Sequence, residues 1–324
     1  MKQVVVSFLG LGTVGAQAYQ YIVDNQERLK EDLQMEVKIG KIFVKNLTKK
    51  RDVVVSKDIL TDDPYEALEV ADIVLECIGG NGASITRELV LWALNHGKSV
   101  IMSSKKCLAQ YGSEITQAAK ENNVLLRYDA TVGGGIPISS ALRTMAKCEE
   151  ITKIYGICNA TSNYILNQMA MEGISYEESL QQAQKLGIAE NDPTDDVDGF
   201  DSLYKAVILS GFGMNQWIDP SSIKPGSIRN ITEKEIDEAR KNQTVIKLRF
   251  QVSKDSQGVS CEVAPVRVNE SEQLARVSGM ENIIIVQSSE SGERSFQGLG
   301  AGAKATASAM YDDFYGILEV FALV

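Results

Sequence analysis

The segment that first suggests chemistry is residues 10–15, whose sequence Gly-Leu-Gly-Thr-Val-Gly fits the pattern G-x-G-x-x-G. It directly follows the apolar run Val4–Leu9 and opens a helical pattern, which is the context that a dinucleotide-binding turn needs. The glycines permit a tight turn and let the backbone approach a pyrophosphate, and free N–H groups at the helix start favour that anion. The alternative is a glycine-rich turn without a ligand. We predict that the cofactor contacts Gly10, Leu11, Gly12, Thr13, Val14 and Gly15.

The basic segment after the second expected strand, 37–44, bears on which dinucleotide binds. Sites selective for NAD usually carry an acidic residue at the end of this strand, where it bonds the ribose 2′-hydroxyl. Here the strand is followed by Lys45 and then by Lys49, Lys50 and Arg51, and cations suit a 2′-phosphate. We therefore expect NADP rather than NAD, contacted by Lys45, with a solvated basic loop as the competing interpretation.

A further glycine feature follows the apolar strand expected at 73–78, which ends in Gly79-Gly80. Because glycine has no Cβ, its presence at the carboxyl end of such a strand lets a flat ring or a ribose approach the backbone. We assign Gly79 to the cofactor site, with an ordinary loop as the alternative.

Histidine chemistry is nearly absent, because His96 is the only histidine. It lies at the expected tail of a helix, where a cation suits the helix dipole, and we assign it a structural role. A Ser-His-Asp hydrolase and an H-E-x-x-H metalloenzyme are thereby excluded. In a redox site, a lysine would have to supply or relay the proton.

One such lysine has acidic residues at helical spacing. Asp198, Asp201 and Lys205 are spaced i, i+3 and i+7, so they would share one helix face. Asp201 would then orient Lys205 or carry its proton. The competing interpretation is an Asp–Lys pair on an exposed helix surface, which is common and contributes roughly a few tenths of a kcal/mol.

Acidic residues also crowd the segment ahead of this helix. Helix starts favour carboxylates, and capping explains Asp192 and Asp195. Glu190 and Asp196 remain available to bind the ammonium group of an amino-acid substrate.

A polar run at 159–163 lies where an expected strand leads into a helix. Thr161 or Ser162 is expected to cap that helix. The same polar groups are placed to meet a substrate, but for Ser162 we favour capping.

Composition restricts the class of protein. The chain has 324 residues, 44% of them hydrophobic, and a formal net charge of −10. This length suggests one large or two smaller cores, and an acidic protein is poorly suited to coat nucleic acid or an anionic membrane. The five cysteines include no C-x-x-C pair, which indicates a reduced, cytoplasmic protein. No apolar run is long enough to cross a bilayer, so neither nucleic acid nor a membrane is an expected partner.

The expected elements define two domains. Up to about Gly133, strands alternate with helices, which predicts a doubly wound parallel α/β sheet of the Rossmann type. Within it, helices are expected over Thr13–Leu33 and near 114–121. Beyond Gly133 the elements indicate an α+β domain, and the tail from 306 is predicted to be helical. The predicted dinucleotide-binding domain comprises 1–134 plus 300–324, and the second domain comprises 135–299.

Six motifs together resemble those of homoserine dehydrogenases, and they cover nearly the whole chain in the family's order. The most specific are IAENDPTDDVDGFDSLYK at 188–205 and YDATVGGGIPI at 128–138. The others are GLGTVG (10–15), ECIGG (76–80), GICNATSNYIL (156–166) and GLGAGAKATAS (298–308). The resemblance implies NAD(P)-dependent interconversion of L-homoserine and L-aspartate 4-semialdehyde, a step of threonine, methionine and isoleucine biosynthesis. It also implies a homodimer in which the second domain provides substrate binding, catalysis and dimerisation.

The resemblance assigns catalytic and substrate-binding roles position by position. Lys205 matches the family's catalytic lysine, and Lys105 matches a second lysine near nicotinamide and substrate. Asp201 matches a catalytic carboxylate. Glu190 and Asp196, together with Lys105, match substrate-binding positions.

The resemblance also assigns positions to a cofactor contact near the C-terminus and to a site for a monovalent cation. Gly302 lies in the tail glycine run that returns to the cofactor. The chain departs from the family with Ser104 in place of an amide, Asp129 in place of glutamate and Ala160 in place of glycine. The positions that match a site for a monovalent cation, sodium or potassium, are Asp129, Val132, Gly134 and Ile136.

Two lysines facing one cleft would suit the reduction of an aldehyde. A lysine beside another cation has its charged form disfavoured, which moves it toward proton transfer near neutrality. At least one of Lys105 and Lys205 would stay charged and stabilise the alkoxide. Two alternatives stay open, namely a similar oxidoreductase acting on another amino acid or semialdehyde and a non-catalytic nucleotide-sensing protein. Because the chain stops after its last expected helix, we expect no C-terminal ACT-type regulatory domain.

Overall fold

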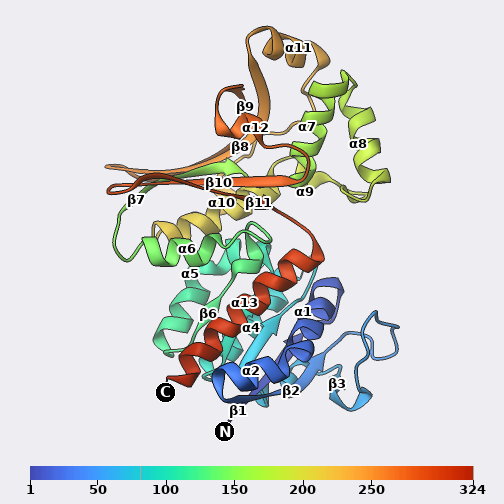
Figure 1. Ribbon diagram of the computed structural model, residues 1–324, viewed down its shortest axis with the longest axis vertical. Helices are drawn as coiled ribbons and strands as arrows, with labels where there is room; N and C mark the ends of the chain where they lie inside the picture. Colours follow the sequence, from blue (N-terminus) through green and yellow to red (C-terminus); the bar gives the residue numbers. More distant parts are fainter. Residues whose placement is uncertain (81, 324) are drawn as a thin grey trace. The chain divides into compact units, whose positions relative to one another are not determined.

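The computed structural model describes residues 1–80 and 82–323. The chain forms two compact units, unit 1 from Met1–Gly135 and Gly302–Val324 and unit 2 from Ile136–Ala301 (Figure 1). Unit 1 contains a parallel sheet between helices, and unit 2 contains an antiparallel sheet with helices. The predicted fold class is thus confirmed. No helix within 1–80 or 82–323 is both long and apolar enough to cross a membrane.

The sheet of unit 1 has six parallel strands in the order β3-β2-β1-β4-β5-β6. The chain leaves β1 for β2 and β3 on one side and returns to the other side of β1 with β4. Sheets of this topology bind dinucleotides at the carboxyl ends of the strands where this reversal occurs, here β1 and β4. The strands are β1 (Lys2–Leu9), β2 (Met35–Phe43), β3 (Leu60–Thr61), β4 (Ile73–Glu76), β5 (Ser99–Met102) and β6 (Leu126–Arg127).

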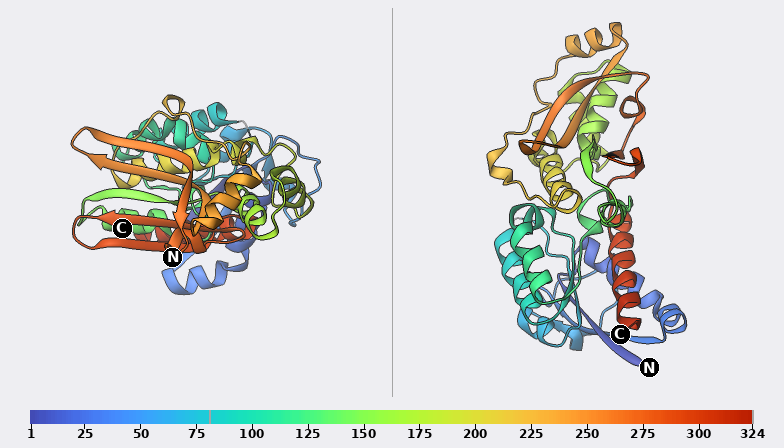
Figure 2. Two further views of the ribbon diagram at one scale, coloured as in Figure 1. Left: turned by 90° about the horizontal axis from the view of Figure 1, so that it is seen from above. Right: turned by 90° about the vertical axis from the view of Figure 1, so that its left-hand side faces the viewer.

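Helices cover both faces of this sheet, with α4 and α5 on one face and α1 and α13 on the other (Figure 2). Strands covered on both faces need apolar side chains at nearly every position, and β4 is buried along its whole length. The helices are α1 (Thr13–Asp24), α2 (Gln26–Leu33), α3 (Pro64–Glu69), α4 (Ala83–Asn95), α5 (Lys105–Glu121) and α13 (Ala303–Ala322), with 3₁₀ helices η1 (Lys57–Ile59) and η2 (Asp129–Thr131).

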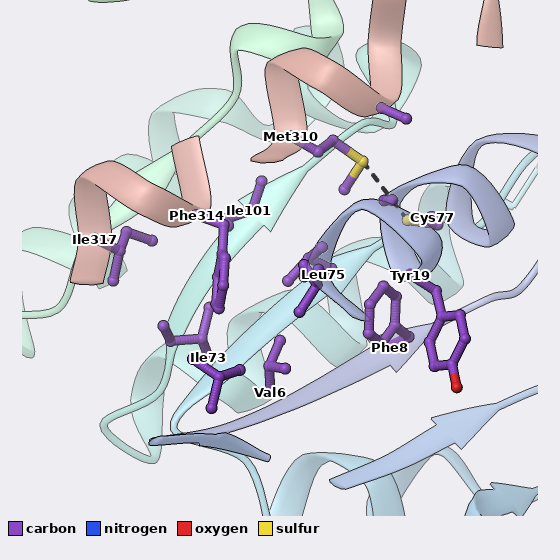
Figure 3. Packing of buried hydrophobic residues seen from close by; sticks show 14 of the residues in the cluster. Val6, Phe8, Tyr19, Ile73, Leu75, Cys77, Ile101, Met310, Phe314 and Ile317 are labelled. Atoms are coloured by element: carbon purple, nitrogen blue, oxygen red, sulfur yellow. Dashed lines mark hydrogen bonds between the residues drawn. The ribbon is translucent and has the colours of Figure 1, made fainter. Parts of the chain in front are cut away.

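The C-terminal helix completes the core of unit 1. Met310 and Phe314 on α13 are fully buried, and they belong to one apolar cluster with Phe8 of β1 and Leu75 of β4 (Figure 3). The Cys77 sulfur, just beyond β4, lies 3.7 Å from the Met310 sulfur. The two ends of the chain are therefore joined around the strands that form the predicted cofactor crevice.

Unit 2 is built on a five-stranded antiparallel sheet in the order β11-β10-β7-β8-β9. Helix α10 is buried on nearly all sides, which is the expected place for a helix that is apolar all round. The elements are α6 (Ile138–Met145), β7 (Ile151–Ile157), α7 (Ala160–Glu172), α8 (Tyr176–Lys185), α9 (Thr194–Val197), α10 (Phe200–Gly213), η3 (Pro220–Ser222), α11 (Glu233–Lys241), β8 (Thr244–Asp255), β9 (Gly258–Asn269), α12 (Gln273–Arg276), β10 (Glu281–Ser288) and β11 (Gly292–Leu299).

Three elements differ from expectation. The helix predicted over Thr13–Leu33 is divided at Asn25, whose side-chain amide donates to the Tyr21 carbonyl oxygen at 2.8 Å and competes with the helical backbone. Helix α5 begins at Lys105, well before the predicted start near 114, because its first turns are too polar to give a clear apolar period. Strand β11 was not predicted, since every second side chain of this edge strand is exposed and several are polar.

Candidate active site

The glycine turn after β1 contains two close approaches of backbone. Gly10 has a φ of 106°, and a Cβ built on it would lie 2.6 Å from the Cys77 carbonyl oxygen. A Cβ on Gly15 would lie 2.6 Å from the Gly10 carbonyl oxygen. Glycine at both positions is therefore required for the packing of β1, α1 and the end of β4.

Gly12, by contrast, faces open space. It is the N-cap of α1, where no side chain caps the helix, and an added Cβ would meet nothing within 4 Å. Uncapped N–H groups at a helix start are suited to an anion. Added Cβ atoms on Gly79 and on Gly302, the N-cap of α13, would also meet nothing within 4 Å. These residues of unit 1 fit a dinucleotide whose pyrophosphate binds at the start of α1.

The basic loop after β2 is ordered by Asn46. The Asn46 Oδ1 accepts hydrogen bonds from the Thr48 N–H at 2.9 Å and the Lys49 N–H at 3.1 Å. The Arg51 guanidinium donates to the Asn46 and Lys49 carbonyl oxygens at 2.6 and 2.8 Å. Arg51 is thus occupied within the loop, whereas the Lys45 side chain is exposed.

Glu76 is a buried carboxyl that sequence reasoning did not assign to the site, although it lies in the motif at 76–80. It ends β4 and is completely buried. Its Oε1 accepts from the Ile78 N–H at 2.7 Å, and its Oε2 accepts from the N–H groups of Ser103 at 3.2 Å and Ser104 at 2.9 Å. Burial raises the pKa of Glu76 from 4.5 to about 7, and the three N–H donors oppose that rise. A single glutamate at a strand end belongs to no spacing pattern, so the sequence did not indicate that its carboxyl is buried and bonded to the main chain.

The buried Glu76 carboxyl makes the stability of the protein depend on pH. Its pKa in the folded state lies above its ordinary value, so the stability that it contributes is complete below about pH 4.5 and is lost as the pH rises through about 7. Glu76→Gln removes this titration. We therefore expect the free energy of unfolding of the variant, relative to wild type, to rise by up to about 3 kcal/mol between pH 4.5 and 8 in urea unfolding of the full chain. A difference between variant and wild type that stays constant across this range would contradict the assignment.

Lys105 and Lys106 are the first two residues of α5, and both are half-buried. Ser104, the N-cap, makes no side-chain capping bond, and the first turn has no acidic residue. Cations at a helix start oppose the helix dipole. Helix formation therefore does not explain the two lysines, and local conflicts of this kind concentrate at functional sites.

Lys205 lies in the interior of unit 2, with 7% of its surface exposed. Its Nζ donates to the Asp201 Oδ2 at 2.7 Å and to the Cys158 carbonyl oxygen at 2.5 Å. The interpretation of Asp201 and Lys205 as an exposed surface pair is therefore wrong. A buried pair with additional hydrogen bonds holds the amine in one place.

Asn159 joins this pair to Asp196. The Asn159 Nδ2 donates to the Asp196 Oδ1 at 2.7 Å and to the Asp201 Oδ2 at 2.9 Å. The Asn159 Oδ1 accepts from the Ser162 N–H at 2.8 Å and so caps α7. The expectation that Thr161 or Ser162 caps this helix is thus wrong, since α7 begins at Ala160 and Asn159 takes the N-cap position. One buried amide both starts a helix and bridges two carboxylates.

Asp198 does not share the helix face of Lys205, contrary to the spacing argument. It precedes α10, and Gly199, with a φ of 80°, turns the chain between them. The Asp198 carboxylate pairs with Arg229 at 2.7 Å, and this guanidinium lowers the pKa of the carboxyl. Asp198 is therefore engaged outside the Lys205 cluster.

The other acidic residues of this segment lie nearer the surface. The N-cap of α9 is Pro193, while Asp192 accepts from the Thr194 N–H at 3.2 Å and Asp195 lies exposed in the first turn of α9. Glu190 is exposed, and its carbonyl oxygen accepts from the Gln184 side chain at 3.2 Å. Of the two predicted substrate carboxylates, Asp196 is the one that the structure joins to Lys205.

The predicted cation ligands begin in a buried turn. Asp129 is buried in η2, and its N–H donates to the Asp313 Oδ2 at 2.8 Å. Val132 follows it, and Gly134 has a φ of 57°. Apart from the Asp129 carboxylate these positions offer main-chain oxygens, which hard cations accept as ligands, and Ile136 is the first residue of unit 2. Among the described side chains, no group of three or more His, Cys, Asp and Glu is placed to hold a metal ion.

Comparison with known proteins accounts for both units. The family model described as "Homoserine dehydrogenase, NAD binding domain" matches residues 10–129, and the model described as "Homoserine dehydrogenase" matches residues 137–315. A homoserine dehydrogenase of Bacillus subtilis (strain 168) is 36% identical over 321 residues, which cover 98% of this chain and 74% of that protein.

Solved structures agree with these sequence matches. The crystal structure of a homoserine dehydrogenase from Thiobacillus denitrificans has a TM-score of 0.90 and 32% identity, covering 100% of this chain and 75% of the other. A hyperthermophilic archaeal homoserine dehydrogenase in complex with NADPH has a TM-score of 0.80 and 27% identity, covering 96% of both chains. The alternative of an oxidoreductase for another amino acid is not favoured by any of these matches. With a dinucleotide crevice in one unit, a buried lysine–carboxylate cluster in the other and family matches across both, the chain belongs to the homoserine dehydrogenase family.

Proposed function

We propose that Lys205 exchanges the proton with the substrate oxygen when L-homoserine and L-aspartate 4-semialdehyde are interconverted, and that Asp201 holds its amine. The buried contact of 2.7 Å between Lys205 Nζ and Asp201 Oδ2 carries this proposal. An ammonium group has three N–H donors, and two of them are used by Asp201 and Cys158. Among the described residues the third has no acceptor, so it is available to a substrate oxygen.

Lys105 is the second lysine of the proposed reaction. Its positive charge stabilises the alkoxide that forms when the aldehyde is reduced, and it contacts the cofactor as well. Glu190 and Asp196 bind the ammonium group of the amino acid, which a pair of carboxylates recognises by charge. When bound, the reduced nicotinamide supplies the hydride.

The reaction is tested by the loss of nicotinamide absorbance when NADPH is mixed with L-aspartate 4-semialdehyde. We expect turnover with this substrate and none with semialdehydes that lack the α-ammonium group. Equal rates with and without that group would refute the proposed carboxylate contacts. Parallel runs with NADH, and with sodium or potassium added or withheld, test the cofactor and cation proposals below.

Gly12 provides a direct test of the cofactor site. Its φ of −80° is open to alanine and an added Cβ meets nothing within 4 Å, so Gly12→Ala is expected to leave the melting temperature unchanged. The methyl group would occupy the space of the pyrophosphate, and the Kd for NADPH should rise about tenfold or more. Gly15→Ala is the contrasting variant, because its Cβ meets backbone at 2.6 Å and should destabilise the fold. Unchanged NADPH affinity in Gly12→Ala would remove the start of α1 from the site.

The dinucleotide is proposed to be NADP. The exposed Lys45 after β2 suits a 2′-phosphate, and the archaeal relative was solved with NADPH. Lys45→Ala should raise the KM for NADPH about fivefold and leave the KM for NADH unchanged. Lys38→Ala, an exposed lysine on β2 itself, is the matched control. Equal effects of Lys45→Ala on both cofactors would contradict a contact with the 2′-phosphate.

The remaining proposals concern the ion, the assembly and the cell. A sodium or potassium ion held by the Asp129 carboxylate and by the carbonyls of Val132, Gly134 and Ile136 would brace the turn after η2.

A homodimer through unit 2 is supported by exposed apolar residues at one end of β10 and β11, where Met280 and Leu299 are 46% and 58% exposed. Five free cysteines suit the reducing cytoplasm, where threonine and methionine precursors are made. Sedimentation of the full chain tests the dimer.

A further inference from the structure

Glu76 connects two loops at the carboxyl edge of the parallel sheet of unit 1. Its strand lies between β1 and β5, with Leu9 and Met102 as its register partners. The side chain bonds the Ile78 N–H in its own loop through one oxygen and reaches the loop after β5 through the other. The Glu76 carbonyl oxygen also accepts from the Ser103 N–H at 3.1 Å and the Ser103 hydroxyl at 2.9 Å.

The Glu76 carboxyl provides a hydrogen-bond acceptor at the start of α5, where the helix has none of its own. The helix opens with Lys105 and Lys106, has no acidic residue in its first turn and receives no capping bond from the Ser104 side chain. An acceptor or negative charge at a helix start satisfies its open N–H groups and offsets the dipole. Glu76 does this from a neighbouring strand by accepting from the N–H of the N-cap residue, Ser104, at 2.9 Å.

We propose that Glu76 is a positioning residue of the dehydrogenase reaction, which fixes the loop after β5 and the first turn of α5 and thereby sets the place of Lys105. This rests on the role proposed above for Lys105. The same carboxyl also bonds the Ile78 N–H, just ahead of Gly79. One side chain therefore positions the main chain at both Gly79 and Lys105.

Burying the Glu76 carboxyl is unfavourable for the stability of the fold. No cation pairs with Glu76 in the described part of the chain, and a buried carboxylate without a counter-ion is destabilising. Burial raises the pKa of Glu76 to about 7, in the direction that this cost requires. The thiols of Cys77 and Cys107 interact with Glu76, and burial raises the pKa of Cys107 to about 12 and that of Cys77 well above its usual value, so both are uncharged at neutral pH. A residue kept at such a cost is explained better by placement of a reacting group than by stability.

The test is a double-mutant cycle between Glu76→Gln and Lys105→Ala in the full chain. Glu76→Gln keeps the size but turns an N–H donor toward main-chain N–H groups. We expect kcat to fall about 10- to 100-fold, because misplacement of a reacting group by about 1 Å has effects of this size, with the Kd for NADPH changed less than about threefold. In the Lys105→Ala background, Glu76→Gln should add less than about threefold, because the group it positions is gone. Leu29→Ala, a buried change on α2, controls for lost stability and should leave kcat unchanged.

The outcomes separate this proposal from the one on which it rests. Full activity of Lys105→Ala would refute the role of Lys105, and with it that of Glu76. A loss of activity in Lys105→Ala, combined with an equal effect of Glu76→Gln in both backgrounds, would refute positioning through Lys105 alone. Hydrogen exchange gives a reading without turnover, since the amides of residues 103–108 should exchange at least about tenfold faster in Glu76→Gln while those of α2 do not. Unchanged exchange there would also overturn the proposal. If Glu76→Gln does not fold, Glu76→Asp is used, which keeps the charge but is one methylene too short to hold all three amides.

Discussion

Replacing Lys205 with alanine is expected to lower kcat for the NADPH-dependent reduction of L-aspartate 4-semialdehyde by about a thousandfold. General acid–base catalysis by a positioned side chain contributes about 10²- to 10⁴-fold, and the only histidine, His96, lies exposed at the end of α4 and stacks on Trp92. The Kd for NADPH should change less than about threefold, because the glycine turn and the basic loop belong to unit 1 and not to unit 2. Absorbance of the nicotinamide band measures the rate, and fluorescence titration measures cofactor binding.

A second buried lysine in unit 2 offers a matched control for this result. Lys247 on β8 is 1% exposed, and its Nζ donates to the side-chain oxygens of Asn163 and Asn167 at 2.9 and 2.7 Å and to the Val277 carbonyl oxygen at 2.6 Å. Lys247→Met should destabilise the unit, as Lys205→Ala should by removing a buried cation that contacts Asp201, but it should keep kcat within about fivefold. Turnover of Lys205→Ala within tenfold of wild type would falsify the proton-transfer role.

The chemistry of the lysine cluster was visible in the sequence, but its burial was not. The spacing of Asp201 and Lys205 predicted contact correctly, and surface pairs have the same spacing. What decides between them is the rest of α10, where residues 206–209 are all apolar and buried. A single lysine within such a run is a better indication of a buried amine than spacing alone.

Contacts that depend on the pairing of distant segments could not be predicted. Glu76 meets Ser103 and Ser104 only because β4 pairs in parallel with β5, with Glu76 opposite Met102. The cap of α7 was misassigned for a different, local reason. Asparagine, serine and threonine are all good N-caps, so the sequence alone does not say which of the polar residues near 160 directly precedes the first turn of α7.

Asn159 both caps α7 and bridges the carboxylates of Asp196 and Asp201, and Asn159→Asp separates these two functions. We expect this variant to lower kcat about 100-fold or more. Aspartate caps helices as well as asparagine does, so the bond to the Ser162 N–H and the start of α7 are retained. The Nδ2 donor is replaced by an oxygen that faces the carboxylates of Asp196 and Asp201 at 2.7 and 2.9 Å. Two existing carboxylates and a new one placed between them cannot all be ionised, and the pKa of at least one must rise strongly. If Asp201 takes up a proton, its hold on the Lys205 ammonium is lost.

The pH dependence distinguishes this cause from a general defect. Protonation of the new acid restores one donor to the bridge, so the activity of Asn159→Asp relative to wild type should increase as the pH falls from 8 to 6. The same substitution one turn further along, Asn163→Asp, places its carboxylate beside the Lys247 ammonium instead, since Asn163 Oδ1 lies 2.9 Å from that nitrogen. Asn163→Asp is therefore expected to keep kcat within about threefold at every pH. A loss in Asn159→Asp that does not vary with pH, or an equal loss in Asn163→Asp, would mean that the amide serves only to start α7.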